Sequence, residues 1–123
     1  MTPTHRARIV PIKALQLDMP VSYEKWGGIQ NAKSGDWLIF KGGEIYSCDR
    51  QVFEDTYRPL EGGEKGQFYK DACIEAHVAE AGGTVATLEG TSAFEAGDYI
   101  VTNPGGDMYV IRADKFHLLY EGM

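Results

Sequence analysis

Two aspartates, Asp36 and Asp98, are the residues of this chain whose type and spacing most directly suggest chemistry. Each follows a glycine and precedes an aromatic residue, in the segments SGDWLIF and AGDYIVT. A pair of carboxylates can hold a divalent metal or act as acid and base. The Gly-Asp pair also has a structural explanation, because glycine permits positive φ and an aspartate can accept hydrogen bonds from the backbone amides of a turn. We favour the turn, and the metal site stays open as the alternative.

The histidines and cysteines do not form a recognisable catalytic set. His77 and His117 have no counterpart in the other half of the chain, and no serine or cysteine is spaced to suggest a nucleophile with its base. Cys48 and Cys73 lack CxxC spacing and a nearby pair of histidines, so they do not resemble a zinc site. We expect buried free thiols, with a disulfide or a reactive thiol as alternatives. The sequence thus predicts no catalytic residue, no metal ligand and no cofactor.

Aromatic residues supply the other candidates for a binding site. Those that recur in both halves of the chain are expected in the core. Trp26, Phe68 and Tyr69 do not recur, and an aromatic side chain that the fold does not demand can line a pocket or contact a partner. Together with Asp36 and Asp98 they are our predicted ligand- or partner-binding residues. Packing of the joint between the two halves is the alternative explanation for these three aromatics.

The sequence of the elements that must position these residues occurs twice in the chain. Aligning Ile12 with Ile74 runs without a gap to Trp37 and Tyr99, and one inserted residue near Pro104 then restores the register. The matched pairs include Gly28 with Gly90, Gly35 with Gly97, Asp36 with Asp98, Tyr46 with Tyr109, Phe53 with Phe116 and Tyr57 with Tyr120. Such self-similarity indicates an internal duplication.

Each copy has the pattern of a small antiparallel unit. Apolar residues alternate in RIVPIKALQL and in IEAHVAE, which predicts an opening strand. A hairpin follows, and the Gly-Gly pairs of KGGE and PGGD predict the turn of a second hairpin. The closing F-x-x-x-Y of each copy places two aromatic residues on one face of a short helix. Asp49 and Asp114 are expected as the N-caps of these helices.

These patterns predict an α+β fold that is mainly antiparallel β, with two pseudo-repeats at residues 9–57 and 72–120. Each repeat comprises several short strands closed by a short helix. Residues 58–71 contain PLEGGEKGQFYKD, carry glycine and charge, and are predicted to be a linker. The 123 residues are enough for one compact domain overall. Exposed strand edges could pair between chains, so a homodimer is an open alternative.

Composition argues against several classes of partner. The net charge of −6 and the pI near 5.0 repel polyanions, so we expect no nucleic-acid partner. The basic residues His5, Arg6 and Arg8 are too few for a basic arm and are expected to be a solvated tail. No apolar run approaches the roughly 20 residues of a membrane helix, and no apolar signal follows the first methionine. We therefore expect a cytoplasmic protein without a membrane partner.

The two copies resemble known families. The first copy, GDWLIFKGGEIYSCDRQVFEDTY, resembles a short domain common in phage and prophage proteins, in which a GDWI-type turn precedes a G-E-x-Y-x-C strand and a closing F-x-x-x-Y. The second copy, TLEGTSAFEAGDYIVTNPGGDMYVIRADKFHLLY, is similar to a bacterial group named for a Pro-Gly-Asp-Tyr-Gly motif, although Ala96 precedes Gly97 and Ile100 follows Tyr99 here. The resemblance implies the architecture and a phage or bacterial origin. It assigns no catalytic residue, because these families are functionally uncharacterised.

The sequence thus favours a non-catalytic binding or interaction module. A cleft between the two copies would take an unidentified small molecule or a protein partner. The alternative is a small metal-dependent hydrolase that uses Asp36 and Asp98. Glu44 and Asp107 would enlarge that acidic site only if the two copies faced each other across a pseudo-twofold axis.

Overall fold

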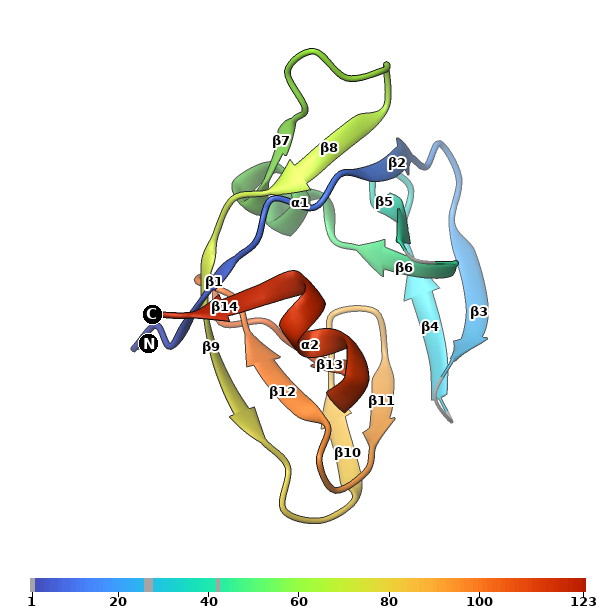
Figure 1. Cartoon of the computed structure of the whole chain (residues 1–123). Coiled ribbons are helices and arrows are strands. Elements are labelled where there is room, and N and C mark those ends of the chain that lie inside the picture. Colours follow the sequence, from blue (N-terminus) through green and yellow to red (C-terminus); the bar gives the residue numbers. More distant parts are fainter. Residues whose placement is uncertain (1, 26–27, 42) are drawn as a thin grey trace.

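The fold consists of two five-stranded antiparallel sheets, two separate two-stranded hairpins and two short helices (Figure 1). The computed structural model describes residues 2–25, 28–41 and 43–123 of the chain. The predicted α+β class with mainly antiparallel strands is confirmed. Neither helix in the described part of the chain has the length and apolar character needed to cross a membrane.

The first half of the chain contains seven strands and one helix. In order these are β1 (His5–Ala7), β2 (Ile12–Gln16), β3 (Val21–Lys25), β4 (Gly28–Ala32), β5 (Trp37–Lys41), β6 (Glu44–Cys48), α1 (Arg50–Thr56) and β7 (Tyr57–Pro59).

The second half contains the same kinds of element in the same order. They are β8 (Gln67–Lys70), β9 (Cys73–Val78), β10 (Gly83–Ala86), β11 (Thr91–Phe94), β12 (Tyr99–Thr102), β13 (Met108–Ile111), α2 (Ala113–Leu119) and β14 (Tyr120–Gly122). Each element of one half therefore has a counterpart in the other.

The two halves exchange their first strands. One sheet has the order β6-β5-β2-β8-β7 and the other β13-β12-β9-β1-β14. Strand β8 opens the second half, yet it lies in the first sheet, where Phe68 is paired with Ile12 and Pro59. Strand β1 opens the first half and lies in the second sheet, where His5 is paired with Ile74 and Gly122. Each sheet is thus completed by a strand from the other half, and the two halves are interlocked.

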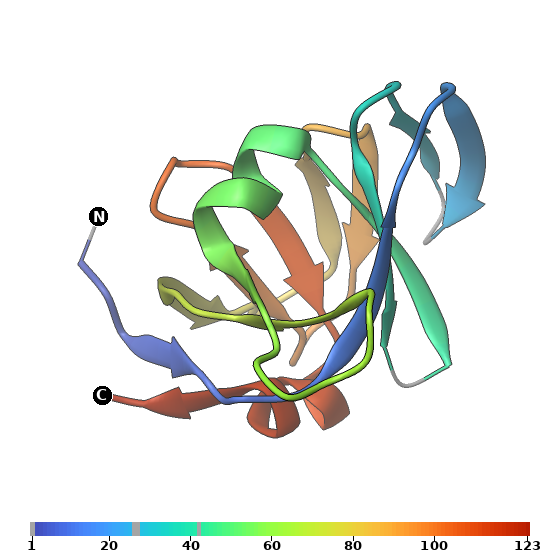
Figure 2. The ribbon, with the colours of Figure 1, turned by 90° about the horizontal axis from the view of Figure 1, so that it is seen from above.

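This exchange corrects two expectations from the sequence. Residues 58–71 contain the hairpin between β7 and β8 and are part of a sheet, not only a linker. The segment with His5, Arg6 and Arg8 is not a solvated tail, because it forms β1 between β9 and β14. Figure 2 shows this blue strand beside the red C-terminal strand. Both segments are short and polar, and their strand character comes from the hydrogen bonds that neighbouring strands offer them.

The core of each half is a stack of aromatic rings behind its helix. In the first half Trp37 stacks on Phe53 with ring centroids 4.1 Å apart, and Phe53 stacks on Tyr57 at 4.8 Å. Phe68 of the exchanged strand meets Phe53 edge-on at 5.1 Å. These contacts fix α1 against both its own sheet and the strand supplied by the other half.

The second half repeats this stack with different residues at its ends. Tyr99 stacks on Phe116 at 3.8 Å, and Phe116 stacks on Tyr120 at 5.3 Å. His5 takes the edge-on place, 4.8 Å from Phe116. The aromatic residues that recur in the sequence are therefore core residues.

Outside the two sheets, the halves also meet where β4 lies beside β11 (Figure 1). Gln30 and Gly90 form an antiparallel bridge, and the Gln30 side chain donates to the carbonyl oxygen of Thr91 over 2.9 Å. A Cβ atom on Gly28 would lie 2.0 Å from that same oxygen, and one on Gly90 would lie 2.1 Å from the carbonyl oxygen of Ile29. Only glycine permits this approach of two backbones.

Replacing Gly90 should therefore separate the two halves locally. We expect Gly90→Ala to lower the free energy of unfolding by about 3 kcal/mol, because the new methyl group meets backbone and the residue has a positive φ of 153°. Urea denaturation measures the change. Gly105→Ala is the matched control, since its Cβ would meet only a side-chain oxygen at 3.8 Å. Equal stability of the two variants would contradict the close approach.

Candidate functional site

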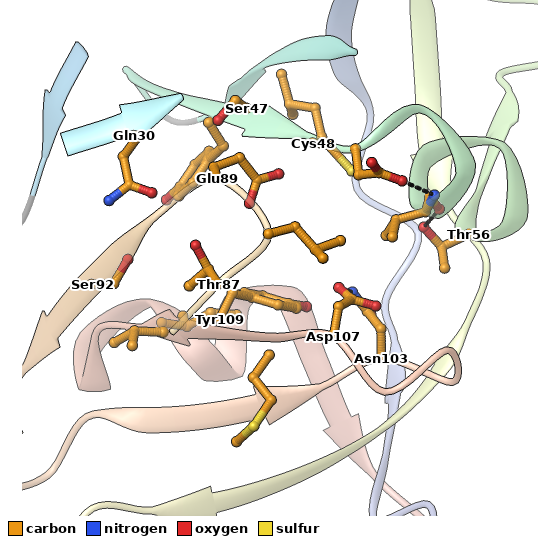
Figure 3. Close-up of a pocket in the computed structure, with 18 of the residues that line it drawn as sticks. Gln30, Ser47, Cys48, Thr56, Thr87, Glu89, Ser92, Asn103, Asp107 and Tyr109 are labelled. Atoms are coloured by element: carbon orange, nitrogen blue, oxygen red, sulfur yellow. Dashed lines mark hydrogen bonds between the residues drawn. The ribbon is translucent and has the colours of Figure 1, made fainter. Parts of the chain in front are cut away.

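A cavity of about 120 Å³ lies between the two halves, beside the contact of β4 with β11. A single water needs only roughly 10–15 Å³ on this measure, so the cavity has room for a small organic molecule. Figure 3 shows Gln30, Ser47 and Cys48 on one side, and Ser92 and Tyr109 on the other. The interlocked halves thus enclose a space that neither would form alone.

The walls come from matching positions of the two halves but carry different side chains. Tyrosines are kept on both sides, as Tyr46 with Tyr109 and Tyr57 with Tyr120. Other matched positions differ, and these are Lys41 with Asn103, Gln30 with Ser92, and Cys48 with Ile111. The frame of the cavity is therefore nearly symmetric, whereas its charges are not.

Lys70 crosses the cavity wall from the first sheet to the second half. Its Nζ donates to Asn103 Oδ1 over 2.8 Å and to the hydroxyl oxygens of Tyr109 and Tyr120, each over 2.7 Å. The side chain is 7% exposed. Burial, assisted by the neighbouring charge of Lys41, lowers the pKa of Lys70 to about 7. Its three donors all have acceptors, so the amine is buried but fully hydrogen-bonded.

The two tyrosines that receive Lys70 also bond to each other. Their hydroxyl oxygens lie 2.5 Å apart. Burial raises the pKa of Tyr109 well above its ordinary value, and the pKa of Tyr120 is raised for the same reason. Both hydroxyls therefore remain protonated at neutral pH and hold Lys70 as neutral partners. In the second sheet, Ala7 lies opposite Tyr120 as Lys70 lies opposite Tyr57 in the first, so this lysine has no counterpart.

Lys41 lines the same cavity from the end of β5. It is half-buried, and burial lowers its pKa to about 8. No side chain or carbonyl in the described ranges accepts a hydrogen bond from its amine. At neutral pH this residue still carries most of its positive charge in a partly desolvated place.

Glu89 contributes a negative counterpart from the turn between β10 and β11 (Figure 3). Its backbone oxygen accepts from the N–H of Asn31 over 2.5 Å, which ties the turn to β4. Its own backbone N–H donates to the carboxyl group, which has no ion-pair partner in the part of the chain that the structure describes. Burial raises the pKa of Glu89 to about 7, helped by the negative charges of Asp36, Asp107 and Asp49.

Other charged groups around the cavity are already occupied. Lys25 donates to the carbonyl oxygen of Ile45 over 2.7 Å and lies over the Tyr46 ring, and burial lowers its pKa to about 8. Glu44 accepts from the Tyr46 hydroxyl and forms an ion pair with Lys115 of α2 at 2.9 Å. Asp107 accepts from Asn103 Nδ2 over 2.8 Å.

Asp36 acts as the turn residue that the sequence favoured. Its carboxylate is 2% exposed and accepts from the N–H groups of Lys33 over 2.8 Å and Arg50 over 3.1 Å. It thereby joins the turn before β5 to the first turn of α1. The Lys33 amine lies 3.5 Å away and supplies the compensating charge.

Asp98 repeats this arrangement in the second half. It is 5% exposed and accepts from the N–H groups of Glu95 over 2.9 Å and Ala113 over 3.3 Å. Arg112 adds an ion pair at 2.5 Å. Burial acts to raise the pKa of Asp98, but the Glu95 amide and the Arg112 guanidinium outweigh it, so the pKa lies below its ordinary value. Each aspartate is bound within its own half, and among the described residues no group of three or more His, Cys, Asp or Glu is placed to hold a metal.

The helix caps follow the prediction in one half only. Asp49 is the N-cap of α1, and its side chain accepts from the N–H groups of Gln51 and Val52. Asp114 is not a cap, because it lies in the first turn of α2 and Arg112 occupies the N-cap position. At the start of α2 the N–H of Ala113 donates to Asp98.

Two of the remaining predicted site residues, Phe68 and Tyr69, do not line the cavity. Phe68 belongs to the aromatic core, and Tyr69 lies half-buried opposite Arg58 in the β7–β8 ladder. Trp26 falls outside the described residues. Both cysteines are free thiols; Cys48 borders the cavity, where burial raises its pKa.

Sequence reasoning missed the three charged residues that distinguish the cavity, Lys41, Lys70 and Glu89. The repeat contained a usable signal for Lys41, because this charged residue aligns with the uncharged Asn103 when the two copies are superposed in sequence. Comparisons with protein families, curated proteins and solved structures give no significant match to this chain. We therefore argue its function from the cavity itself.

The buried turn aspartates should contribute to stability. We expect Asp98→Asn to lower the free energy of unfolding by about 2 kcal/mol, because the amide group cannot accept from all three donors and loses the charge that faces Arg112. Asp114→Asn, at an exposed position of the same helix, should change it by less than about 0.5 kcal/mol. Chemical denaturation of the two variants side by side tests this, and an Asp98→Asn protein as stable as the parent would contradict the clamp.

Lys70 should make stability depend on pH above neutrality. Its pKa is about 7 in the folded protein and 10.5 as an ordinary lysine, so unfolding takes up a proton between these values. Stability should therefore rise from pH 7 to about pH 8.5, the range below the ionisation of exposed thiols. Lys25 and Lys41 act in the same direction, whereas Glu89, with its pKa raised to about 7, opposes the rise mainly at the lower end of this range.

Lys70→Met removes one of these contributions, so its stability should rise less steeply than that of the parent over the same pH range. Urea denaturation at both pH values gives the two slopes. Identical slopes would show that Lys70 does not titrate differently in the folded and unfolded states.

Proposed function

We propose that the protein is a non-catalytic binding module that takes a small molecule in the cavity between its two halves. The observation that carries this proposal is the pair of charged side chains, Lys41 and Glu89, that border the cavity without an ion-pair partner among the described residues. Folding alone gives no reason to place uncompensated charges there, because each costs desolvation energy. A ligand that neutralises them gives such a reason.

The surroundings of the cavity favour binding over covalent chemistry. The Cys48 thiol has a raised pKa, so little of it is the reactive thiolate. The amine of Lys70 is held by three oxygens. Apolar side chains such as Ile39, Val110 and Met108 share the wall with these polar groups, a mixture typical of small-molecule sites.

The origin and setting of the module belong to the same proposal. We infer that the two halves descend from a duplication, which the shared order of elements and the paired glycines Gly28 and Gly90 support. The resemblance of the GDW and GDY segments supports a phage or bacterial source. The free thiols of Cys48 and Cys73 suit a reducing, cytoplasmic setting.

A thermal-shift screen tests the proposal. Amino acids, carboxylates, amines, nucleosides, sugars and divalent metals are each added to the purified protein. A ligand at about a hundred times its dissociation constant should add roughly 2.7 kcal/mol of stability. Ser92→Leu, which places a larger side chain in the cavity wall, should abolish the shift, whereas Ser34→Leu in an exposed turn should retain it.

Circular dichroism establishes that both variants are folded before the comparison. No shift with any compound would contradict a small-molecule site. A shift that survives in the folded Ser92→Leu protein would place the ligand outside the cavity.

A further inference from the structure

The two charged groups of the cavity that lack an ion-pair partner among the described residues have opposite signs and belong to different halves. Lys41 lies at the end of β5 in the first half, and Glu89 lies in the β10–β11 turn of the second. They do not form an ion pair with each other, and neither has an ion-pair partner among the described residues. The cavity thus presents a positive group and a negative group in separate places.

The cavity wall also carries apolar side chains. Ile39, Leu88, Met108, Val110 and Ile111 all border the cavity, so it can hold a short hydrocarbon chain. The other amines of the wall do not compete for the same role, because Lys70 has three acceptors and Lys25 is bonded to a backbone oxygen.

We propose that the ligand is a short-chain zwitterion, an ω-amino acid whose carboxylate faces Lys41, whose ammonium faces Glu89 and whose methylene chain lies along the apolar wall. This inference rests on the proposed binding function and names the ligand class of the same site. A flexible chain with opposite charges at its two ends can reach two groups that lie in different halves and do not pair with each other. An α-amino acid, with both charges on adjacent atoms, lacks this freedom.

The unliganded protein should carry the cost of this arrangement. A desolvated charge without a partner destabilises the folded state, and a neutral residue of similar size removes that cost. Lys41→Met and Glu89→Gln should therefore fold at least as stably as the parent. Loss of binding in these variants then reports the ligand contact and not a failure to fold, since loss of function with retained stability is the usual sign of a site residue.

Calorimetric titration with γ-aminobutyrate, δ-aminopentanoate and ε-aminohexanoate tests the proposal. We expect at least one of them to bind, and Lys41→Met and Glu89→Gln each to weaken its binding tenfold or more. Matched controls change the same residue types elsewhere: Lys13→Met on the exposed outer side of the first sheet and Glu24→Gln on the β3–β4 hairpin should alter affinity less than twofold. Hexanoate and hexylamine, which carry one charge each, should bind more weakly than the zwitterion.

Proton release provides a second readout that packing effects would not produce. Burial and the negative charges of Asp36, Asp107 and Asp49 raise the pKa of Glu89 to about 7, so its carboxyl group is about half protonated at pH 7. An ammonium ion bound beside it lowers that pKa and expels the proton. Titration in buffers of different ionisation enthalpy should therefore show proton release in the parent protein, and Glu89→Gln should abolish it. The lysines, tyrosines and thiol around the cavity remain in both proteins.

The outcomes separate this inference from the function on which it rests. Zwitterion binding that depends on both Lys41 and Glu89 and releases protons supports it. Binding of a neutral or singly charged compound that neither variant weakens would overturn the ligand class and leave the binding module standing. Failure of every compound in this series and in the thermal-shift screen would overturn both.

Discussion

The backbone contact between β4 and β11 is the constraint on which the rest of the molecule depends. The carbonyl oxygen of Thr91 lies against Gly28, and that of Ile29 lies against Gly90, at distances that a Cβ atom on either glycine would prevent. The contact anchors the Glu89 turn to Asn31 and sets the width of the cavity beside it. The exchange of β1 and β8 holds the halves together at the other end. A cavity braced in this way keeps its shape without a ligand, which lowers the entropic cost of binding one.

The two halves share a framework but carry different polar side chains. Matched tyrosines and aromatic stacks pack in the same way in both halves, while other residues at matched positions of the cavity wall differ in charge and polarity. Lys70 illustrates the consequence: its partner position holds Ala7, and its amine bonds across the divide to Asn103 and two tyrosines. A lysine on both sides would place two buried amines together, which the low dielectric of the interior opposes. One lysine links the two halves by hydrogen bonds, whereas the charges of two lysines would repel each other.

The sequence predicted the local features well and the long-range ones poorly, for a physical reason. Gly-Asp turns, Gly-Gly hairpins and the F-x-x-x-Y helices depend on neighbours along the chain, and the Asp49 cap is confirmed. The exchanged strands depend on a partner far away, so the polar segment that contains β8 resembled a linker. Phe68 was assigned to a surface because its structural equivalent is His5, which lies outside the aligned repeat and is not a phenylalanine. Lys41 and Glu89 became notable only when folding buried them.

Burial also explains why the charges of the cavity point to function. A folding chain gains nothing from a buried carboxyl group that has no ion-pair partner, and the raised pKa of Glu89 records that cost. Lys70 shows that this protein can satisfy a buried charge completely, because each of its donors has an acceptor. The contrast between this lysine and two charged groups without an ion-pair partner around one cavity therefore separates structural charge from charge kept for a ligand. Lys41 and Glu89 would then lower the stability of the unliganded protein and strengthen the binding of its ligand. Such a trade-off between stability and function is common at binding sites.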